Sequence, residues 1–147
     1  MWQAELVKQF HKNLNEMLVE IFTNANHNFE KSKILLSIFF SGDKEMKRLN
    51  SHYRNINNST NILSFPVLKE NNNSVKNFLG DIIFSSETIH KEAKQEKKHI
   101  YNHLVHLFVH GILHLLGYDH QNEENAIVME NLEIKILKKL CIENPYI

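Results

Sequence analysis

The segment HLFVHGILHLLGYDH (residues 106–120) carries the features that decide both the fold and the chemistry of this chain. It is strongly apolar up to Gly117 and predicts a helix, on which His110 and His114, four residues apart, project from one face. Gly117 favours the left-handed conformation that ends a helix. The turn that follows can return His120 to the same face, so the segment predicts three converging imidazoles.

Three neutral imidazoles from a helix and the following turn form an open tetrahedral zinc site. Zn–N bonds in such a site measure about 2.0–2.1 Å, and water takes the fourth position. Zinc lowers the pKa of that water to about 7, which supplies a hydroxide nucleophile at neutral pH. We therefore predict one zinc ion per chain, bound by His110, His114 and His120. The alternative is a set of packed core histidines, because 10 histidines in 147 residues can produce this spacing by chance.

The neighbouring polar residues have less specific interpretations. His99, His103 and His106 lie on the same helical stripe as the predicted ligands, but residues eight apart on a helix are separated by about 12 Å and cannot all bind one ion. We expect His99 and His103 to pack or to face solvent, and His106 to be a core histidine, with a contact to substrate or to a ligand as its alternative. Asp119 either orients a ligand imidazole or caps the turn.

The rest of the chain predicts one α+β domain over residues 1–147. Runs rich in β-branched and aromatic residues predict strands over 34–41, 62–65 and 78–85. Apolar residues spaced three or four apart predict helices over 3–22, 43–54, 87–116 and 123–140. Asp43 is the expected N-cap of the second helix, and Arg54 is expected at its end. The polar segment 69–77 predicts a loop between two strands, of a length that is often functional.

Composition excludes several classes of protein. Apolar residues make up 42% of the chain, which excludes a disordered protein, and the apolar runs are too short to span a bilayer. We see no export signal, and Cys141 is a single cysteine, which we expect in the core of a protein in a reducing compartment. We therefore expect a cytoplasmic protein without a membrane partner. Lys plus Arg and Asp plus Glu number 17 each, so a nucleic-acid role must rest on a local site or a larger assembly.

Two reactions fit the histidine spacing. The metzincin peptidase pattern H-E-x-x-H-x-x-G-x-x-H has the same spacing and a glutamate as general base after the first histidine. That position is Gly111 here, which disfavours peptide hydrolysis. Arg54 can bind a phosphate through two parallel hydrogen bonds and stabilise charge on its oxygens, which favours phosphodiester hydrolysis if Arg54 folds near the ion. The alternative for Arg54 is a surface cation at a helix end.

Three segments resemble the signatures of the YbeY family of bacterial endoribonucleases and rRNA maturation factors. They are LNSHYRNINNSTNILSFP (49–66), LGDIIFS (79–85) and HLFVHGILHLLGYDH (106–120), and ENPYI (143–147) fits the family's ending. The resemblance covers roughly residues 34–147. It implies an α+β fold in which a small mixed sheet packs with helices around a central, zincin-like metal-bearing helix.

The resemblance also implies roles for individual residues. It implies zinc on His110, His114 and His120, and a role for Arg54 in catalysis or RNA binding. We therefore expect Arg54 and His114 to be catalytic. The residues expected to contact substrate, beside Arg54, are Asn61, Ser64 and Phe65. The strand around Ser64 and the loop 67–78 would line the path of the RNA. We find no general base in the sequence, so attack by a ribose 2′-OH stays open beside attack by water.

The biological role follows from the same resemblance. It implies cleavage of single-stranded RNA in small-subunit rRNA 3′-end maturation, ribosome assembly and quality control. The partners it implies are the small ribosomal subunit, a ribosomal protein and an assembly GTPase. The alternatives are a non-catalytic ribosome-assembly adaptor with a structural zinc, for which Asp119 is the candidate fourth ligand, and a metallopeptidase. The chain departs from the family at 57–60, where NNST replaces D-x-P-T, and this predicts a more flexible approach to the second strand.

Overall fold

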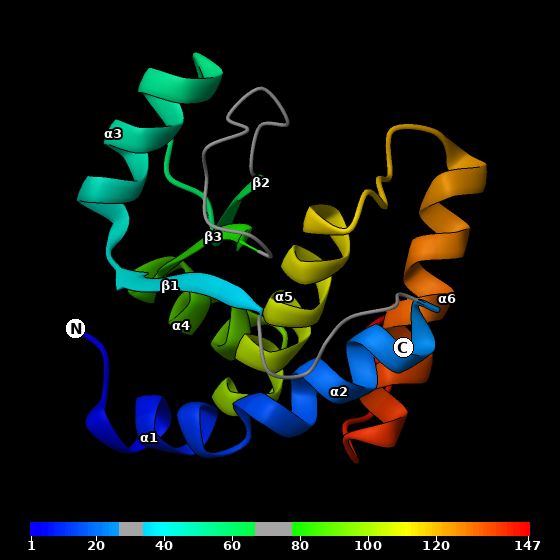
Figure 1. The fold of residues 1–147 in the computed structure, drawn as a ribbon. Coiled ribbons are helices and arrows are strands. Elements are labelled where there is room, and N and C mark those ends of the chain that lie inside the picture. The colour runs from blue at the N-terminus through cyan, green and yellow to red at the C-terminus, as the bar shows by residue number, and fades with distance from the viewer. Residues whose placement is uncertain (27–33, 67–77) are drawn as a thin grey trace.

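The computed structural model describes residues 1–26, 34–66 and 78–147. Within these ranges the chain forms an α+β fold of six helices and a three-stranded sheet (Figure 1). In chain order the elements are α1 (Ala4–Lys12), α2 (Leu14–Asn24), β1 (Leu35–Ser41), α3 (Asp43–Arg54), β2 (Ile62–Pro66), β3 (Phe78–Ser85), α4 (Ser86–Gln95), α5 (Ile100–Leu115) and α6 (Glu123–Lys139). The predicted fold class is confirmed. No helix of the described residues is long and apolar enough to cross a membrane.

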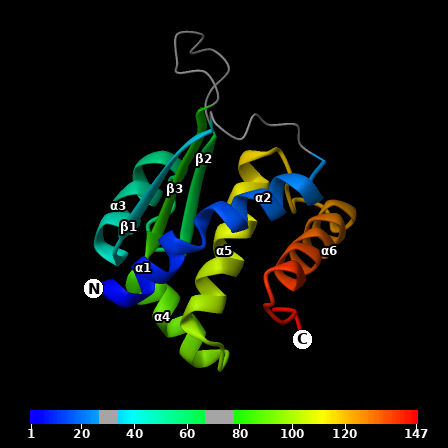
Figure 2. The same cartoon turned by 60° about the horizontal axis from the view of Figure 1, so that its bottom comes forward.

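The sheet is mixed and has a different helix on each face. Its strand order is β1-β3-β2, with β1 parallel and β2 antiparallel to the central strand β3. Because side chains alternate along a strand, Leu63 and Ile83 point to one face, where they pack with Met46 of α3. Ile82 points to the other face, toward α5. Figure 2 shows α3 on one side of the sheet and α5 on the other.

The helix α5 is the central element of the larger core. Ten of its sixteen residues are buried, because the sheet and the other helices surround it. Phe108 of α5 meets Phe10 of α1 edge to face, with ring centroids 5.0 Å apart, and Phe84 of β3 packs against both rings. A helix packed in this way is a rigid support for side chains at its one open face.

Two predicted helices are each divided in two. The prediction for 3–22 is wrong at Asn13, where the backbone leaves the helical conformation and the side-chain Nδ2 donates to Tyr101 Oη at 2.8 Å. The prediction for 87–116 is wrong at Lys97, which adopts a left-handed φ of 55°. His99 then caps α5, its Nδ1 accepting a hydrogen bond from the backbone nitrogen of Tyr101 at 3.3 Å.

Two single-residue predictions also need correction. Gly42, not Asp43, is the N-cap of α3, and the Asp43 carboxylate instead accepts hydrogen bonds from the hydroxyls of Ser59, Ser85 and Thr88. Cys141 is exposed rather than in the core, because the chain leaves α6 at Leu140 and Cys141 takes a φ of 61°.

The segment before β2 is held at two points, although we expected it to be flexible. Ser59 Oγ donates to Asp43 at 2.9 Å, and Asn50 Nδ2 donates to the carbonyl of Asn58, also at 2.9 Å. Both bonds tie the segment to α3, the helix that ends at Arg54. The predicted loop 69–77, and all of 67–78 except Phe78, lie outside the described residues.

Candidate metal centre

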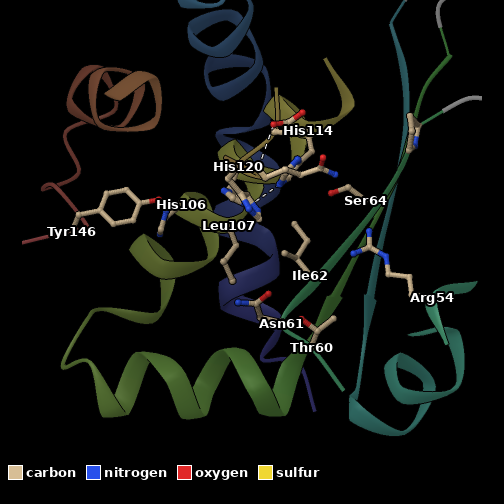
Figure 3. Close-up of a pocket in the computed structure, with 14 residues that line it drawn as sticks. Arg54, Thr60, Asn61, Ile62, Ser64, His106, Leu107, His114, His120 and Tyr146 are labelled. Carbon is tan, nitrogen blue, oxygen red and sulfur yellow. Dashed lines mark hydrogen bonds between the residues drawn. The ribbon is translucent and has the colours of Figure 1, made fainter. Parts of the chain in front are cut away.

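Three histidine side chains meet at the C-terminal end of α5. His110 and His114 project from one face of the helix, and their ring centroids lie 4.5 Å apart. Gly117, with a φ of 102°, ends the helix and returns the chain, so that His120 lies 5.4 Å from His110 and 4.9 Å from His114 by ring centroid. One ring nitrogen of each histidine lies within 4.8 Å of the others (Figure 3). The three are positioned to bind a metal ion.

The hydrogen bonds of the ligand rings orient the nitrogens for metal binding. His110 Nδ1 lies 3.0 Å from a Glu133 carboxylate oxygen, and His114 Nδ1 lies 2.9 Å from the carbonyl of Tyr118. A carbonyl and a carboxylate only accept, so both Nδ1 atoms carry a proton, and in the neutral rings the lone pair that can bind a metal is on Nε2. The two Nε2 atoms lie 3.0 Å apart. Two nitrogens on one tetrahedral zinc are about 3.3 Å apart, so the pair fits a shared ion.

The electrostatics of the cluster favour neutral ligands. Burial lowers the pKa of His114, and the neighbouring His110 and His120 lower it further, because a second positive charge in the group is unfavourable. A neutral imidazole is the form that coordinates a metal, whereas an imidazolium has no lone pair to give. The donor set therefore fits a divalent ion of the kind that imidazole binds, zinc among them.

The histidines open into a cleft of about 710 Å³ between α5 and β2. Arg54, at the end of α3, lines the same cleft, and Figure 3 shows it across from the histidines with its guanidinium directed into the space between them. Arg54 is exposed, and within the described residues its guanidinium makes no hydrogen bond or ion pair. The arrangement brings a free cation and three metal-binding imidazoles into one cleft.

The other predicted contact residues are divided between the two faces of β2. Asn61 and Ser64 line the cleft, together with Ile62 and the neighbouring Thr60. Phe65 does not line it, because it points to the opposite face and packs toward α3, with its ring 5.4 Å from that of Tyr53. The role predicted for Phe65 in substrate binding stays a prediction, without a place in the cleft to support it.

Asp119 and His103 have structural partners. Asp119 Oδ1 accepts hydrogen bonds from the backbone of Gln121 and from Asn125 Nδ2, so it caps the turn that carries His120. It is not in the metal-binding group, which contains three ligands among the described residues. His103 is buried and its Nε2 donates to Glu92 at 3.0 Å. Within the described residues Asp119 therefore lies outside the three-histidine group, and its hydrogen bonds support a role in the turn.

Glu133 of α6 is a participant that the sequence analysis missed. Burial alone would raise the pKa of this carboxyl, but hydrogen bonds from His106 and His110 hold it at about 2, so it is ionised. His106, which we expected in the core, lines the cleft and contacts this carboxylate. The sequence contains a sign of this residue, because Glu133 is a charged residue in the otherwise apolar buried stripe of Met129, Ile136 and Leu137 on α6.

Gly111 faces the sheet and not the metal-binding group. A Cβ at this position would lie 2.7 Å from Cδ1 of Ile62 and 2.9 Å from Cδ1 of Ile82. A glutamate here would have to displace the packing of α5 on β2 and β3. The position that holds the general base in metzincins is therefore closed by the fold of this chain.

Comparisons with known proteins agree with this geometry. The family model described as Endoribonuclease YbeY matches residues 2–141. Proteins named Endoribonuclease YbeY from Bartonella bacilliformis and from Francisella tularensis subsp. holarctica are 49% and 42% identical. The first match covers 76% of this chain and 71% of the relative, and the second covers 82% and 75%. A solution structure of a Thermotoga maritima protein has the same fold, with a TM-score of 0.56 at 18% identity over 96% of this chain and 87% of that one. On the family match and these identities, the chain belongs to the YbeY endoribonuclease family.

Proposed function

We propose that this protein is a zinc-dependent endoribonuclease that cleaves single-stranded RNA. Its role would be in small-subunit rRNA 3′-end maturation, ribosome assembly and quality control. The observation that supports the proposal is the cleft in which His110, His114 and His120 face Arg54, whose guanidinium makes no hydrogen bond or ion pair within the described residues. A metal site beside a free guanidinium suits a substrate with a negatively charged reacting group, and a phosphodiester is such a group.

The chain's own residues then have distinct tasks. A zinc ion held by the three histidines supplies Lewis-acid polarisation of a phosphoryl oxygen or activation of a water. Arg54 binds the phosphate through paired hydrogen bonds and balances the charge that develops on its oxygens. His114 is catalytic through the metal that it binds. Its own Nδ1 is committed to the carbonyl of Tyr118, so it is not the group that removes the proton from the nucleophile.

Asn61 and Ser64 are proposed to recognise the RNA beside the reacting phosphate. The Nδ2 of Asn61 already donates to both oxygens of Glu92, at 3.0 and 3.2 Å. Its amide oxygen accepts no hydrogen bond within the described residues, and an acceptor suits a ribose hydroxyl or a base N–H rather than a phosphate. The hydroxyl of Ser64 can donate or accept a hydrogen bond, so it can contact either a phosphate or a ribose hydroxyl. The 2′-hydroxyl is the feature that distinguishes RNA from DNA, which makes Asn61 a candidate for that discrimination.

The partners proposed are single-stranded rRNA and the small ribosomal subunit, with a ribosomal protein and an assembly GTPase among the proteins that bring them together. The formal net charge of zero supports this dependence, since the chain lacks the excess of cations that holds free RNA by its phosphates. We therefore expect weak cleavage of naked RNA that falls with added salt.

The two alternative functions have less support. A peptidase needs a general base, and Gly111 at that position faces Ile62 and Ile82 in the core. An adaptor with a structural zinc needs a closed set of four ligands, and Asp119 is committed to the turn. Incubation with an unstructured protein substrate tests the peptidase, and a catalytically inactive variant that still supports ribosome assembly would favour the adaptor.

The decisive experiment separates metal binding from cleavage. His114→Ala should lose both zinc and activity on single-stranded RNA. Arg54→Glu should lose activity while zinc stays near one per chain. Arg48→Glu is the matched control, because Arg48 lies on the same helix, pairs with Glu45 and does not line the cleft. Loss of zinc from the Arg54 variant, or equal loss of activity from both arginine variants, would refute this division of roles.

The ends of the products identify the attacking group. A 2′,3′-cyclic phosphate forms only if the ribose 2′-OH attacks, whereas direct attack by water leaves a linear phosphate and a free hydroxyl. RNA with a 2′-deoxy residue at the cleavage site provides the control. It stays intact on the first route and is cleaved on the second.

A further inference from the structure

A buried charge lies directly behind the metal-binding group. Glu133 is 0% exposed in the middle of α6, surrounded by the apolar side chains of Met129, Ile136 and Leu137. A carboxylate in such a place is strongly destabilising unless donors satisfy it. The described structure gives it three, from His110, His106 and Tyr146. A charge this costly to bury calls for a function beyond packing.

We propose that Glu133 is the positioning residue of the metal centre, and that Tyr146, from the segment after α6, holds Glu133 in place. The inference rests on the proposed function, because it takes His110 as a metal ligand. Glu133 does not touch the ion or the substrate in this scheme. It acts through His110, whose ring it orients and whose basicity it raises.

The shared oxygen explains how one carboxylate can set two imidazoles. Glu133 Oε1 accepts from His110 Nδ1 at 3.0 Å and from His106 Nε2 at 3.1 Å. The first bond places a proton on Nδ1 and directs the Nε2 of His110, the nitrogen left to bind a metal in the neutral ring, toward His114. The second holds the ring of His106 at the cleft, where its Nδ1 is buried and has no partner among the described residues. Neither ring can rotate without breaking its bond to the carboxylate.

Tyr146 contacts the second oxygen of the Glu133 carboxylate, the one that the imidazoles do not use. Its Oη donates to Glu133 Oε2 at 2.8 Å, and its ring meets that of His106 edge to face at 5.5 Å. Figure 3 shows Tyr146 reaching toward His106 from the segment after α6. That segment is itself fastened, because Lys98 Nζ donates to the carbonyl of Pro145 at 2.8 Å and the nitrogen of Tyr146 donates to Asn144.

The two helix ligands are therefore oriented by different parts of the chain. His114 is bonded to Tyr118 in its own turn, four residues away. His110 depends on Glu133 of α6, which is 23 residues away, and through Glu133 on Tyr146. Metal affinity should then fall when α6 or the segment after it is altered, even though neither provides a ligand.

The test measures zinc affinity by competition with a chromogenic chelator. Glu133→Gln has the same shape and its amide oxygen can still accept from both imidazoles, but it lacks the negative charge that raises the basicity of His110. We expect it to weaken zinc binding by about 10- to 100-fold, as loss of an orienting partner does in other metal sites. Tyr146→Phe removes only one hydroxyl at a partly exposed side chain, and should weaken binding by about tenfold or less.

A second carboxylate–histidine pair provides the control. Glu92 of α4 is partly exposed and contacts the buried His103 of α5 at 3.0 Å, but it touches no predicted metal ligand. Glu92→Gln is the same chemical change, and zinc affinity should stay at the wild-type value. His114→Ala tests the underlying assignment. If it binds zinc like the wild type, the proposed function fails, whereas normal binding by Glu133→Gln with none by His114→Ala overturns only the present inference.

A purely structural role for Glu133 is distinguished by two further measurements. A structural residue would lower the melting temperature of the metal-free protein while zinc affinity and coordination stay unchanged, and that result would overturn the proposal. A positioning residue alters the coordination itself. The visible absorption of the cobalt-substituted protein should therefore change in Glu133→Gln and stay unchanged in Glu92→Gln.

Discussion

Replacement of Gly111 by alanine tests how tightly the metal-bearing helix packs on the sheet. The new Cβ would lie 2.7 Å from Ile62 Cδ1, 2.9 Å from Ile82 Cδ1 and 3.0 Å from Ser64 Oγ. Carbon atoms in favourable contact are about 3.5–4.0 Å apart, so at least two side chains must move or α5 must lift from β2.

The size of the effect is a balance of two terms. Alanine gains about 1 kcal/mol over glycine in a helix interior, and overpacking of a filled core costs about 1–3 kcal/mol. We expect Gly111→Ala to be less stable by about 1 kcal/mol, which lowers Tm by about 4 °C in a domain of this size. Gly111→Val adds two methyl groups and a stiff χ1, and should cost more. Urea denaturation followed by circular dichroism measures both.

A double-mutant cycle identifies the contact that is responsible. Ile62→Val removes only Cδ1, the atom nearest to the new Cβ. Alone it should cost about 0.5–1 kcal/mol, because Ile62 is only partly buried. The double variant Gly111→Ala/Ile62→Val should lose at least about 0.5 kcal/mol less unfolding free energy than the two single variants lose together. Strict additivity, or a Gly111→Ala protein more stable than the wild type, would refute the close packing of α5 on β2.

Three further outcomes can be checked by thermal unfolding. Gly80→Ala should lower the free energy of unfolding by more than about 2 kcal/mol, because φ is 148° and a Cβ would lie 2.4 Å from the carbonyl oxygen of Phe65. Gly117→Ala should lower it by about 1 kcal/mol, because a φ of 102° is strained but no atom lies near the new Cβ. Burial raises the pKa of Asp43, but hydrogen bonds from hydroxyl groups outweigh burial and hold the pKa below the usual 3.8. The charge of Asp43 therefore stabilises the fold at neutral pH, and this stabilisation is lost as the pH falls through the lowered pKa. Asp43→Asn should therefore lower Tm at pH 7 by the equivalent of about 1 kcal/mol or less, and equal Tm differences at pH 7 and pH 3 would contradict this. Zinc at 100 times its dissociation constant should add about 2.7 kcal/mol of stability, which a chelator removes and which His120→Ala lacks.

Local sequence pattern was sufficient to predict the fold class, the strands and the histidine group. It failed where distant contacts decide the backbone. The apolar stripe of 3–22 continues in phase across Asn13, because α1 and α2 cover one core, and the break involves a bond to Tyr101, 88 residues away. Asp43 is a residue type that often caps helices, but its carboxylate accepts hydrogen bonds from the hydroxyls of Ser85 in β3 and Thr88 in α4 instead.

Sequence spacing predicted the group of three histidines, but it did not predict the buried carboxylate that contacts one of them. Spacing along one helix relates His110 to His114, yet no spacing relates either to Arg54 or to Glu133, which reach them through the fold. The position of Phe65 on the face opposite Ser64 could also be derived from the sequence. Ser64 and Phe65 are neighbours on a strand and must point to opposite faces, so both could not line the same cleft.

The three candidate ligands differ in how firmly the chain holds them, and this would set an order of events for metal exchange. His110 and His114 are half-buried on a packed helix, and each has its Nδ1 anchored. His120 is exposed on a turn that rests on the bond from Asn125 to Asp119. An ion would be captured first by the pair and closed in last by His120, and its departure would begin there. The lifetime of a bound ion would then depend on a short surface turn as well as on the residues that support the buried helix.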